Sequence, residues 1–177
     1  MGKLSKAIAY LAGPIDCAAD DGVEWRQQMT KVLEELGVKV LDPTRKLWDA
    51  THEIGKEKDR NIQLKKQGKY KELAVLAKRM RHEDLRCVDI CDFIVAFVDP
   101  NIHMCGTYDE IFAAERQKKP ILVVINGGRG CTPTWLFDVF PLDDMFDTFA
   151  DLAERLENIN NGSYGMDTRW VLLRDHL

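Results

Sequence analysis

Short, wholly apolar runs separated by longer amphipathic segments constrain this fold most. Three such runs stand out, at 7–12 (AIAYLA), Phe93–Val98 (FIVAFV) and Ile121–Ile125 (ILVVI), and a fourth short segment, 38–41 (VKVL), is apolar except for Lys39. Runs this short and this apolar are typical of strands buried on both faces. Apolar residues recur at helical spacing in 23–36, 70–86 and 106–118. This alternation predicts right-handed crossovers and a mostly parallel α/β sheet.

We expect one domain over residues 1–177, with five strands and helices on both faces of the sheet. The fifth strand is predicted at the edge, over 170–173, and a last helix over 146–156. A helical insertion at about 49–86 interrupts the alternation. Its 56–81 stretch holds ten Lys or Arg against three acids, a local net charge of +7 that leaves −11 for the remainder. We interpret it as a solvated face, and phosphate steering or a subunit contact is the alternative.

The bulk composition excludes several classes of protein. Hydrophobic residues make up 45% and charged residues 31%, a globular balance, and the net charge of −4 gives no reason to expect nucleic-acid binding. The apolar runs are too short for a membrane span. Five cysteines and four scattered histidines complete neither a disulfide framework nor a metal site. We therefore expect a soluble, cytoplasmic protein without cofactor or metal.

Ligands of parallel sheets bind beyond the carboxyl ends of the strands, so the loops there hold the candidate residues. Gly13 and Pro14 end the first strand, and Tyr10 on that strand points inward with its hydroxyl near the ligand edge. By themselves they are more often a plain turn than a site. Asp92 and Asp99 flank the strand Phe93–Val98, where acids commonly cap loops.

A segment before the next helix, Gly106-Thr107-Tyr108-Asp109-Glu110, supports two interpretations. Thr107-x-x-Glu110 is a capping box, in which the Thr caps the helix and the Glu reaches back to it. The functional interpretation puts Glu110 in the first helical turn, where the helix N-terminus favours its ionised form. An ionised carboxylate is the group that attack on an anomeric carbon requires.

Three motifs in order resemble the nucleoside 2-deoxyribosyltransferase superfamily. They are YLAGPID (10–16) with Trp25-Arg26; DLRCVDICDFIVAFVD (84–99); and GTYDE (106–110) with Ala113-Ala114 and KKPILVVI (118–125). The resemblance covers roughly residues 6–126 and implies a flavodoxin- or Rossmann-like domain. It also implies a small-molecule nucleoside or nucleotide substrate and a homo-oligomer, with no membrane or nucleic-acid partner.

The resemblance assigns roles to particular residues. Glu110 is similar to the family's nucleophile, Tyr10 to the tyrosine that orients it, and Asp92 to an acid that binds the base or supports the pocket. The implied substrate-binding residues are Gly13, Pro14, Asp16, Trp25, Arg26, Asp99, Gly106 and Thr107. Many family members carry an Asp six residues before the nucleophile, where this chain has Met104. Asp99 or Asp16 is our candidate for that role.

The predicted activity is cleavage of an N-glycosidic bond through a glycosyl–Glu110 intermediate, with transfer of the sugar to another base. The missing Asp and the basic insertion leave open a hydrolase of nucleoside 5′-monophosphates. A catalytically silent nucleotide-binding module is a third possibility, although binding alone needs no nucleophile. A Cys–His pair of Cys105 and His103 is a weaker candidate nucleophile, because buried cysteines are usually inert.

Overall fold

The computed structural model describes residues 2–46, 53–164 and 168–170. A five-stranded sheet of order β2-β1-β3-β4-β5 lies at its centre, with every neighbouring pair parallel. The strands are β1 (Ile8–Ala12), β2 (Lys39–Leu41), β3 (Phe93–Val98), β4 (Ile121–Ile125) and β5 (Met145–Phe146). The parallel α/β sheet predicted from the apolar runs is therefore confirmed, as is the position of four of its strands.

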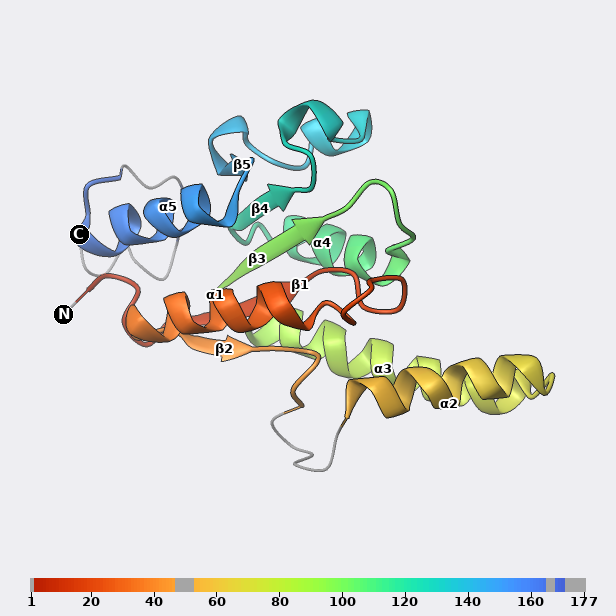
Figure 1. Cartoon of the computed structure of the whole chain (residues 1–177). Helices are drawn as coiled ribbons and strands as arrows, with labels where there is room; N and C mark the ends of the chain where they lie inside the picture. Colours follow the sequence, from red (N-terminus) through yellow and green to blue (C-terminus); the bar gives the residue numbers. More distant parts are fainter. Residues whose placement is uncertain (1, 47–52, 165–167, 171–177) are drawn as a thin grey trace.

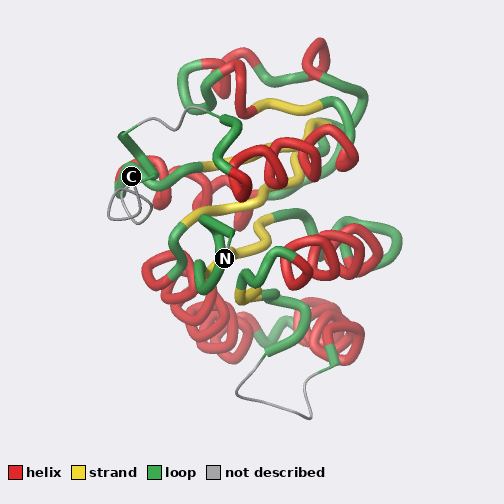
Figure 2. Tube along the Cα trace, turned by 90° about the vertical axis from the view of Figure 1, so that its left-hand side faces the viewer, coloured by secondary structure: helices red, strands yellow, loops and turns green. Residues whose placement is uncertain are grey.

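Helices cover both faces of the sheet (Figures 1 and 2). They are α1 (Val23–Glu35), α2 (Ile54–Lys66), α3 (Tyr70–Ile90), α4 (Cys105–Arg116) and α5 (Phe149–Asn161). Three short 3-10 turns, η1 (Arg129–Cys131), η2 (Thr134–Phe137) and η3 (Leu142–Asp144), connect β4 to β5. None of the described helices is long and apolar enough to cross a membrane.

Alternating side chains divide the core into two layers, as a strand period of two requires. On one face, Leu11 and Val95 pack with α1 and α5 through residues such as Leu33 and Leu156. On the other face, Tyr10 and Ile94 pack with α3 and α4. Because all of these strands run in one direction, their carboxyl ends meet at one edge of the sheet.

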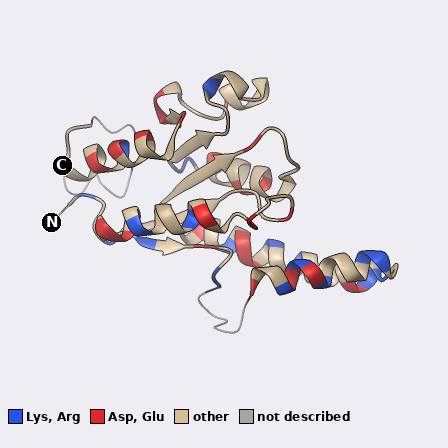
Figure 3. Ribbon diagram, in the orientation of Figure 1, with Lys and Arg blue, Asp and Glu red and all other residues tan. Residues whose placement is uncertain are grey.

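Helices α2 and α3 form an antiparallel arm that projects beyond this edge (Figure 1). Gly68 joins them in a left-handed conformation, with φ +68. Leu64 is the single buried residue of α2, and α3 buries Cys87 and Val88 near its end. Basic side chains gather at the far end of the arm (Figure 3). The predicted helical insertion is confirmed from Ile54 onward, whereas its first residues, 49–52, lie outside the described ranges.

The fifth strand of the described sheet, β5, is not the one predicted over 170–173. Strand β5 precedes α5, whereas 171–173 lie outside the described residues and Trp170 is not in a strand. Trp170 is instead 1% exposed, and its ring lies 5.3 Å from that of Phe93. Helix α5 begins at Phe149, where Thr148 accepts a hydrogen bond from the Asp151 amide, later than the predicted start at 146.

Candidate active site

A cavity of about 550 Å³ opens at the carboxyl edge of the sheet. That volume lies within the range of small-molecule sites. The sheet side of the cavity is lined by Gly13–Asp16 after β1, by Pro43 and Lys46 after β2, and by residues 103–107, 109 and 110. The arm supplies the opposite wall, through Ile54, Glu57, Lys58 and Asn61 of α2 and Ala77, Met80, Arg81, Asp84 and Leu85 of α3.

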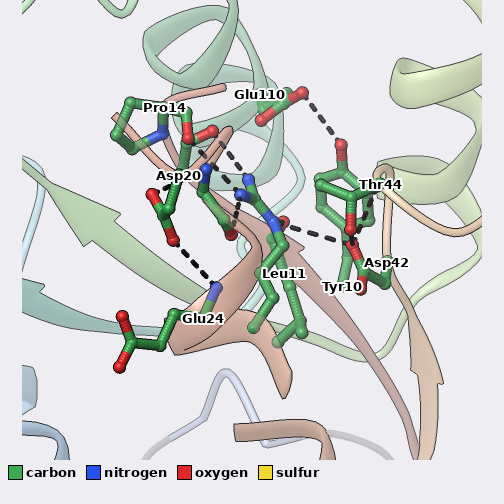
Figure 4. A network of polar contacts seen from close by, with 11 residues as sticks. Tyr10, Leu11, Pro14, Asp20, Glu24, Asp42, Thr44 and Glu110 are labelled. Atoms are coloured by element: carbon green, nitrogen blue, oxygen red, sulfur yellow. Dashed lines mark hydrogen bonds and ion pairs between the residues drawn. The ribbon is translucent and has the colours of Figure 1, made fainter. Parts of the chain in front are cut away.

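Tyr10 and Glu110 meet at this cavity. The Tyr10 hydroxyl donates a hydrogen bond of 2.9 Å to Oε1 of Glu110, drawn in Figure 4. Tyr10 is completely buried, and Glu110 is 9% exposed and contributes to the cavity lining. The third residue of β1 and the sixth residue of α4 thus form one buried pair, although 100 residues separate them in the chain.

Burial dominates the electrostatics of Glu110. Desolvation and the nearby Asp84 raise its pKa to about 8, against the Tyr10 hydrogen bond and the Arg26 charge, which lower it. Burial and the Glu110 carboxylate raise the pKa of Tyr10 well above its ordinary value, so Tyr10 stays protonated and donates. The expectation that the helix N-terminus keeps Glu110 ionised is therefore not met, because burial outweighs it.

The predicted capping box is wrong. Helix α4 begins at Cys105 with Met104 as its N-cap, and that cap makes no side-chain hydrogen bond. Thr107 is consequently the third helical residue, and Glu110 lies in the second turn rather than the first. Thr107 is 4% exposed and lines the cavity together with Gly106. Glu110 is thus directed to Tyr10 and the cavity instead of to the helix end.

The loop after β1 begins at Gly13, which lines the cavity. Trp25 and Arg26 of α1 pack against Gly13 and do not line the cavity. A Cβ on Gly13 would lie 2.5 Å from Cζ2 of Trp25, so only glycine fits there. Trp25 packs on Phe97 and Phe149 in the core and does not line the cavity. Gly13 and Pro14 line the cavity, and Asp16 lines it from an exposed position.

Two predicted acids lie away from the cavity. Asp92 precedes β3 and is therefore at the opposite, amino-terminal edge of the sheet, where its Oδ2 accepts a hydrogen bond of 2.7 Å from the Ile8 amide. Asp99 follows β3 at the ligand edge, but its carboxylate accepts hydrogen bonds from Asn101 and from Nδ2 of Asn126. Neither belongs to the cavity lining.

Asp84 of α3 is the acid that our sequence reasoning missed. It lines the cavity opposite the sheet, and burial raises its pKa to about 6 despite the opposing charge of Lys46. The available signal was helical spacing. Asp84 follows Ala77 and Met80 at intervals of seven and four, so a carboxyl lies on the helix face that turns inward.

Ion pairs join the arm to the elements around the cavity. Lys46 lies 3.2 Å from Glu83 of α3 and 3.4 Å from Glu57 of α2. Arg81 of α3 lies 2.7 Å from Asp109 of α4. Within the described ranges, no group of three or more His, Cys, Asp or Glu side chains is placed to hold a metal ion.

Comparisons with known proteins agree with the motifs. Residues 6–78 match the model of a family described as nucleoside 2-deoxyribosyltransferase like, a stretch that contains Tyr10 and Gly13 but ends before Asp84 and Glu110. No curated protein matches the sequence of the chain.

Two solved structures share the fold. One is a 2-deoxyribosyltransferase from Leishmania mexicana, with a TM-score of 0.56, 19% identity and coverage of 85% of this chain and 97% of that one. The other is a 2-deoxyribosyltransferase from Bacillus psychrosaccharolyticus, with a TM-score of 0.53, 18% identity and coverage of 83% and 90%. The family model thus agrees with the sequence motifs over residues 6–78, and the two solved structures show that the chain shares their fold.

Proposed function

We propose that this protein is an enzyme that cleaves the N-glycosidic bond of a (deoxy)nucleoside or nucleotide and transfers the sugar to another base. The observation that carries this proposal is the buried Tyr10–Glu110 pair at the cavity. A carboxylate held by a protonated phenol has a fixed orientation toward the bound sugar. Cleavage through a glycosyl–enzyme ester needs such a group, as retaining glycosidases illustrate.

In the proposed first step, Glu110 attacks the anomeric carbon. Because Tyr10 binds Oε1, we assign the attack to Oε2, which forms the ester bond while the carbon–nitrogen bond breaks. The bonding electrons leave with the base, whose nitrogen takes a proton from a nearby acid. Asp84 is our candidate for that acid, since it lines the same cavity and its pKa of about 6 leaves it partly protonated near neutral pH.

The proton distribution between the two carboxyls depends on the substrate. In the free protein, burial and the Asp84 charge favour a proton on Glu110. Positive charge that develops on the sugar during cleavage favours the ionised form of Glu110. In the complex that undergoes cleavage, the proton that the pair shares is therefore on Asp84, from which it passes to the leaving base, and Glu110 is ionised.

In the second step, a nitrogen of the acceptor base attacks the same carbon, and the ester bond breaks to restore the Glu110 carboxylate. If water attacks instead, the protein is a hydrolase. Transfer occurs if the cavity holds a second base and excludes water, and hydrolysis occurs if it does not. Reactions with and without an added acceptor base separate the two outcomes, because only transfer yields a new nucleoside.

The test compares the wild type with Glu110→Gln on a panel of nucleosides and nucleotides, with free base and new nucleoside separated by chromatography. We expect the amide to lower turnover by at least about a thousandfold and to form no sugar adduct detectable by mass spectrometry. Glu115→Gln is the matched control, because Glu115 lies on the same helix and pairs with Lys118 outside the cavity. Full activity of Glu110→Gln would refute the proposed nucleophile. Absence of wild-type turnover on every substrate would favour a silent binding module.

A further inference from the structure

Arg26 of α1 is a buried cation that the proposed chemical steps do not use. Its side chain has 0% exposure, and its guanidinium donates to carbonyl oxygens at both ends of the connection between β1 and α1. Nη2 lies 2.7 Å from the Gly13 oxygen, and Nη1 lies 2.8 Å from the Gly22 oxygen. Longer bonds of 3.4 Å reach the oxygens of Leu11 and Pro14.

This network shapes one wall of the cavity. Gly13 and Pro14 line the cavity, and both present their carbonyl oxygens to Arg26 on the other side of the loop. A charged donor that binds several carbonyls fixes the path of a loop more firmly than one neutral hydrogen bond does. The donors of Arg26 are therefore directed to the loop rather than into the cavity, which argues against the predicted role in substrate or phosphate binding.

The charge of Arg26 is only partly balanced where it lies. Its Nε is 3.7 Å from Oδ1 of Asp42, and that oxygen also accepts two hydrogen bonds from Thr44 (Figure 4). A separation of 3.7 Å is an ion pair without the close contact of a bidentate pair. In a buried environment, the remaining field of the guanidinium acts on neighbouring charges with little screening.

The groups that act most on the pKa of Glu110 are Tyr10 from β1, which is hydrogen-bonded to it, Asp84 from α3, Arg26 from α1 and its own neighbour Asp109. Asp84 and Asp109 oppose a negative charge on Glu110, whereas the Tyr10 hydroxyl and Arg26 favour it. Of the two favourable groups, only Arg26 carries a full charge. Without Arg26, the neutral Tyr10 hydroxyl alone of these four groups would favour a negative charge on Glu110.

We propose that Arg26 is a positioning residue with two effects: it holds the loop from Leu11 to Gly22 in the shape that receives the substrate, and its fixed charge keeps Glu110 ionisable. This inference rests on the proposed function, because it takes Glu110 as the nucleophile. The two effects are separable by substitution. Lysine keeps the charge but cannot bind four carbonyls with a planar fork, whereas glutamine removes the charge.

The experiment combines a titration with kinetics. The Glu110 side-chain carboxyl is followed by ¹³C NMR against pH in the wild type, Arg26→Lys and Arg26→Gln, and its signal is assigned by its absence in Glu110→Gln. For Arg26→Gln we expect the titration midpoint to rise by about one pH unit or more. For Arg26→Lys we expect a midpoint close to that of the wild type, with KM raised at least about fivefold by the altered loop.

Lys31→Gln is the matched control, since it removes a cation from an exposed position on the same helix. Its midpoint and KM should equal those of the wild type. An unchanged midpoint in folded Arg26→Gln, or an unchanged KM in Arg26→Lys, overturns the corresponding half of the proposal. If Arg26→Gln does not fold by circular dichroism, the KM of Arg26→Lys still decides the effect on the loop, and a midpoint raised by one pH unit or more in that variant overturns the effect of charge. A wild type without turnover refutes the proposed function, while the titration tests the charge effect independently.

Discussion

The Tyr10 hydroxyl donates a hydrogen bond of 2.9 Å to Oε1 of Glu110, and thereby joins the first strand to the fourth helix. Phenylalanine fills the same space without the donor, so Tyr10→Phe isolates this bond. We expect kcat to fall about 10–100-fold, because a hydrogen bond to a charged group contributes about 1.5–3 kcal/mol. Steady-state kinetics measures this effect. A variant as active as the wild type would show that Glu110 needs no orienting partner.

The proposed mechanism needs an ionised Glu110 and a protonated Asp84, so the pair must share one proton. We therefore expect kcat/KM to be highest between the two pKa values of about 6 and about 8, and to fall at higher pH in an alkaline limb. Tyr10→Phe should move this limb to still higher pH, since the Tyr10 hydrogen bond lowers the pKa of Glu110. The measurement is kcat/KM against pH for both proteins. If kcat/KM instead changes with a pKa near 4.5, the ordinary value of a glutamate, the buried environment of Glu110 would be contradicted.

The same shift predicts how stability depends on pH. A carboxyl whose pKa rises from 4.5 to about 8 on folding binds its proton more tightly in the folded state. Its contribution to stability is therefore present below pH 4.5, decreases as pH rises to about 8, and is constant above. Glu110→Gln should thus be more stable than the wild type at pH 8, by a difference on the order of 3 kcal/mol. Urea unfolding of both proteins at pH 5 and pH 8 measures the difference in their free energies of unfolding. A difference that is the same at both pH values would contradict the raised pKa of Glu110.

Two glycines that line the cavity should respond oppositely to alanine. At Gly13 a Cβ would lie 2.5 Å from the Trp25 ring, whereas nothing lies within 4 Å of a Cβ at Gly106. Gly13→Ala should therefore lower the free energy of unfolding by about 1–3 kcal/mol, as overpacking does. Gly106→Ala should keep or slightly increase stability, because alanine suits a helix better than glycine. Thermal unfolding compares the two, and equal melting temperatures would show that the Trp25 ring yields freely.

Charges in the cavity favour an uncharged substrate. Even with Glu110 protonated, the four carboxylates of Asp16, Glu57, Asp84 and Asp109 outnumber the cations of Lys46, Lys58 and Arg81 in its lining. Each of these cations already pairs with a carboxylate, Lys58 with Asp21 at 2.5 Å. A 5′-phosphate would have to break such a pair, so kcat/KM should be at least about tenfold higher for a nucleoside than for its monophosphate. The opposite preference, weakening as salt rises, would instead support phosphate steering by the basic arm.

We also propose a homo-oligomer of at least two subunits. Among the large apolar residues after β4, Phe140, Phe146 and Trp170 are buried in the core, but Trp135 is 81% exposed and Phe137 46% exposed on η2. The double substitution Trp135→Ser and Phe137→Ser should reduce association, whereas Tyr70→Ser on the arm should not. Light scattering at micromolar concentration measures the mass. A monomeric wild type refutes the proposal.

The structural features that follow from the sequence most directly are those with a local, periodic pattern of residues. Wholly apolar runs such as Phe93–Val98 specify strands buried on both faces, and their alternation with helices leaves few topologies other than a parallel sheet. The sheet direction then brings Gly13 and Glu110 to one edge. The same rule already disfavours Asp92, which precedes its strand and therefore lies at the other edge.

The sequence by itself determined four of the strands and the parallel sheet, because period and strand order act through neighbouring residues, and its family motifs pointed to Tyr10 and Glu110. Only the tertiary structure decided which acid shares the cavity with Glu110, where α4 begins and which way Arg26 points. Those outcomes depend on contacts between distant segments. Asp84 reaches the cavity because α3 crosses beside it, and Glu110 has a raised pKa because the packed sheet and helices exclude water from it.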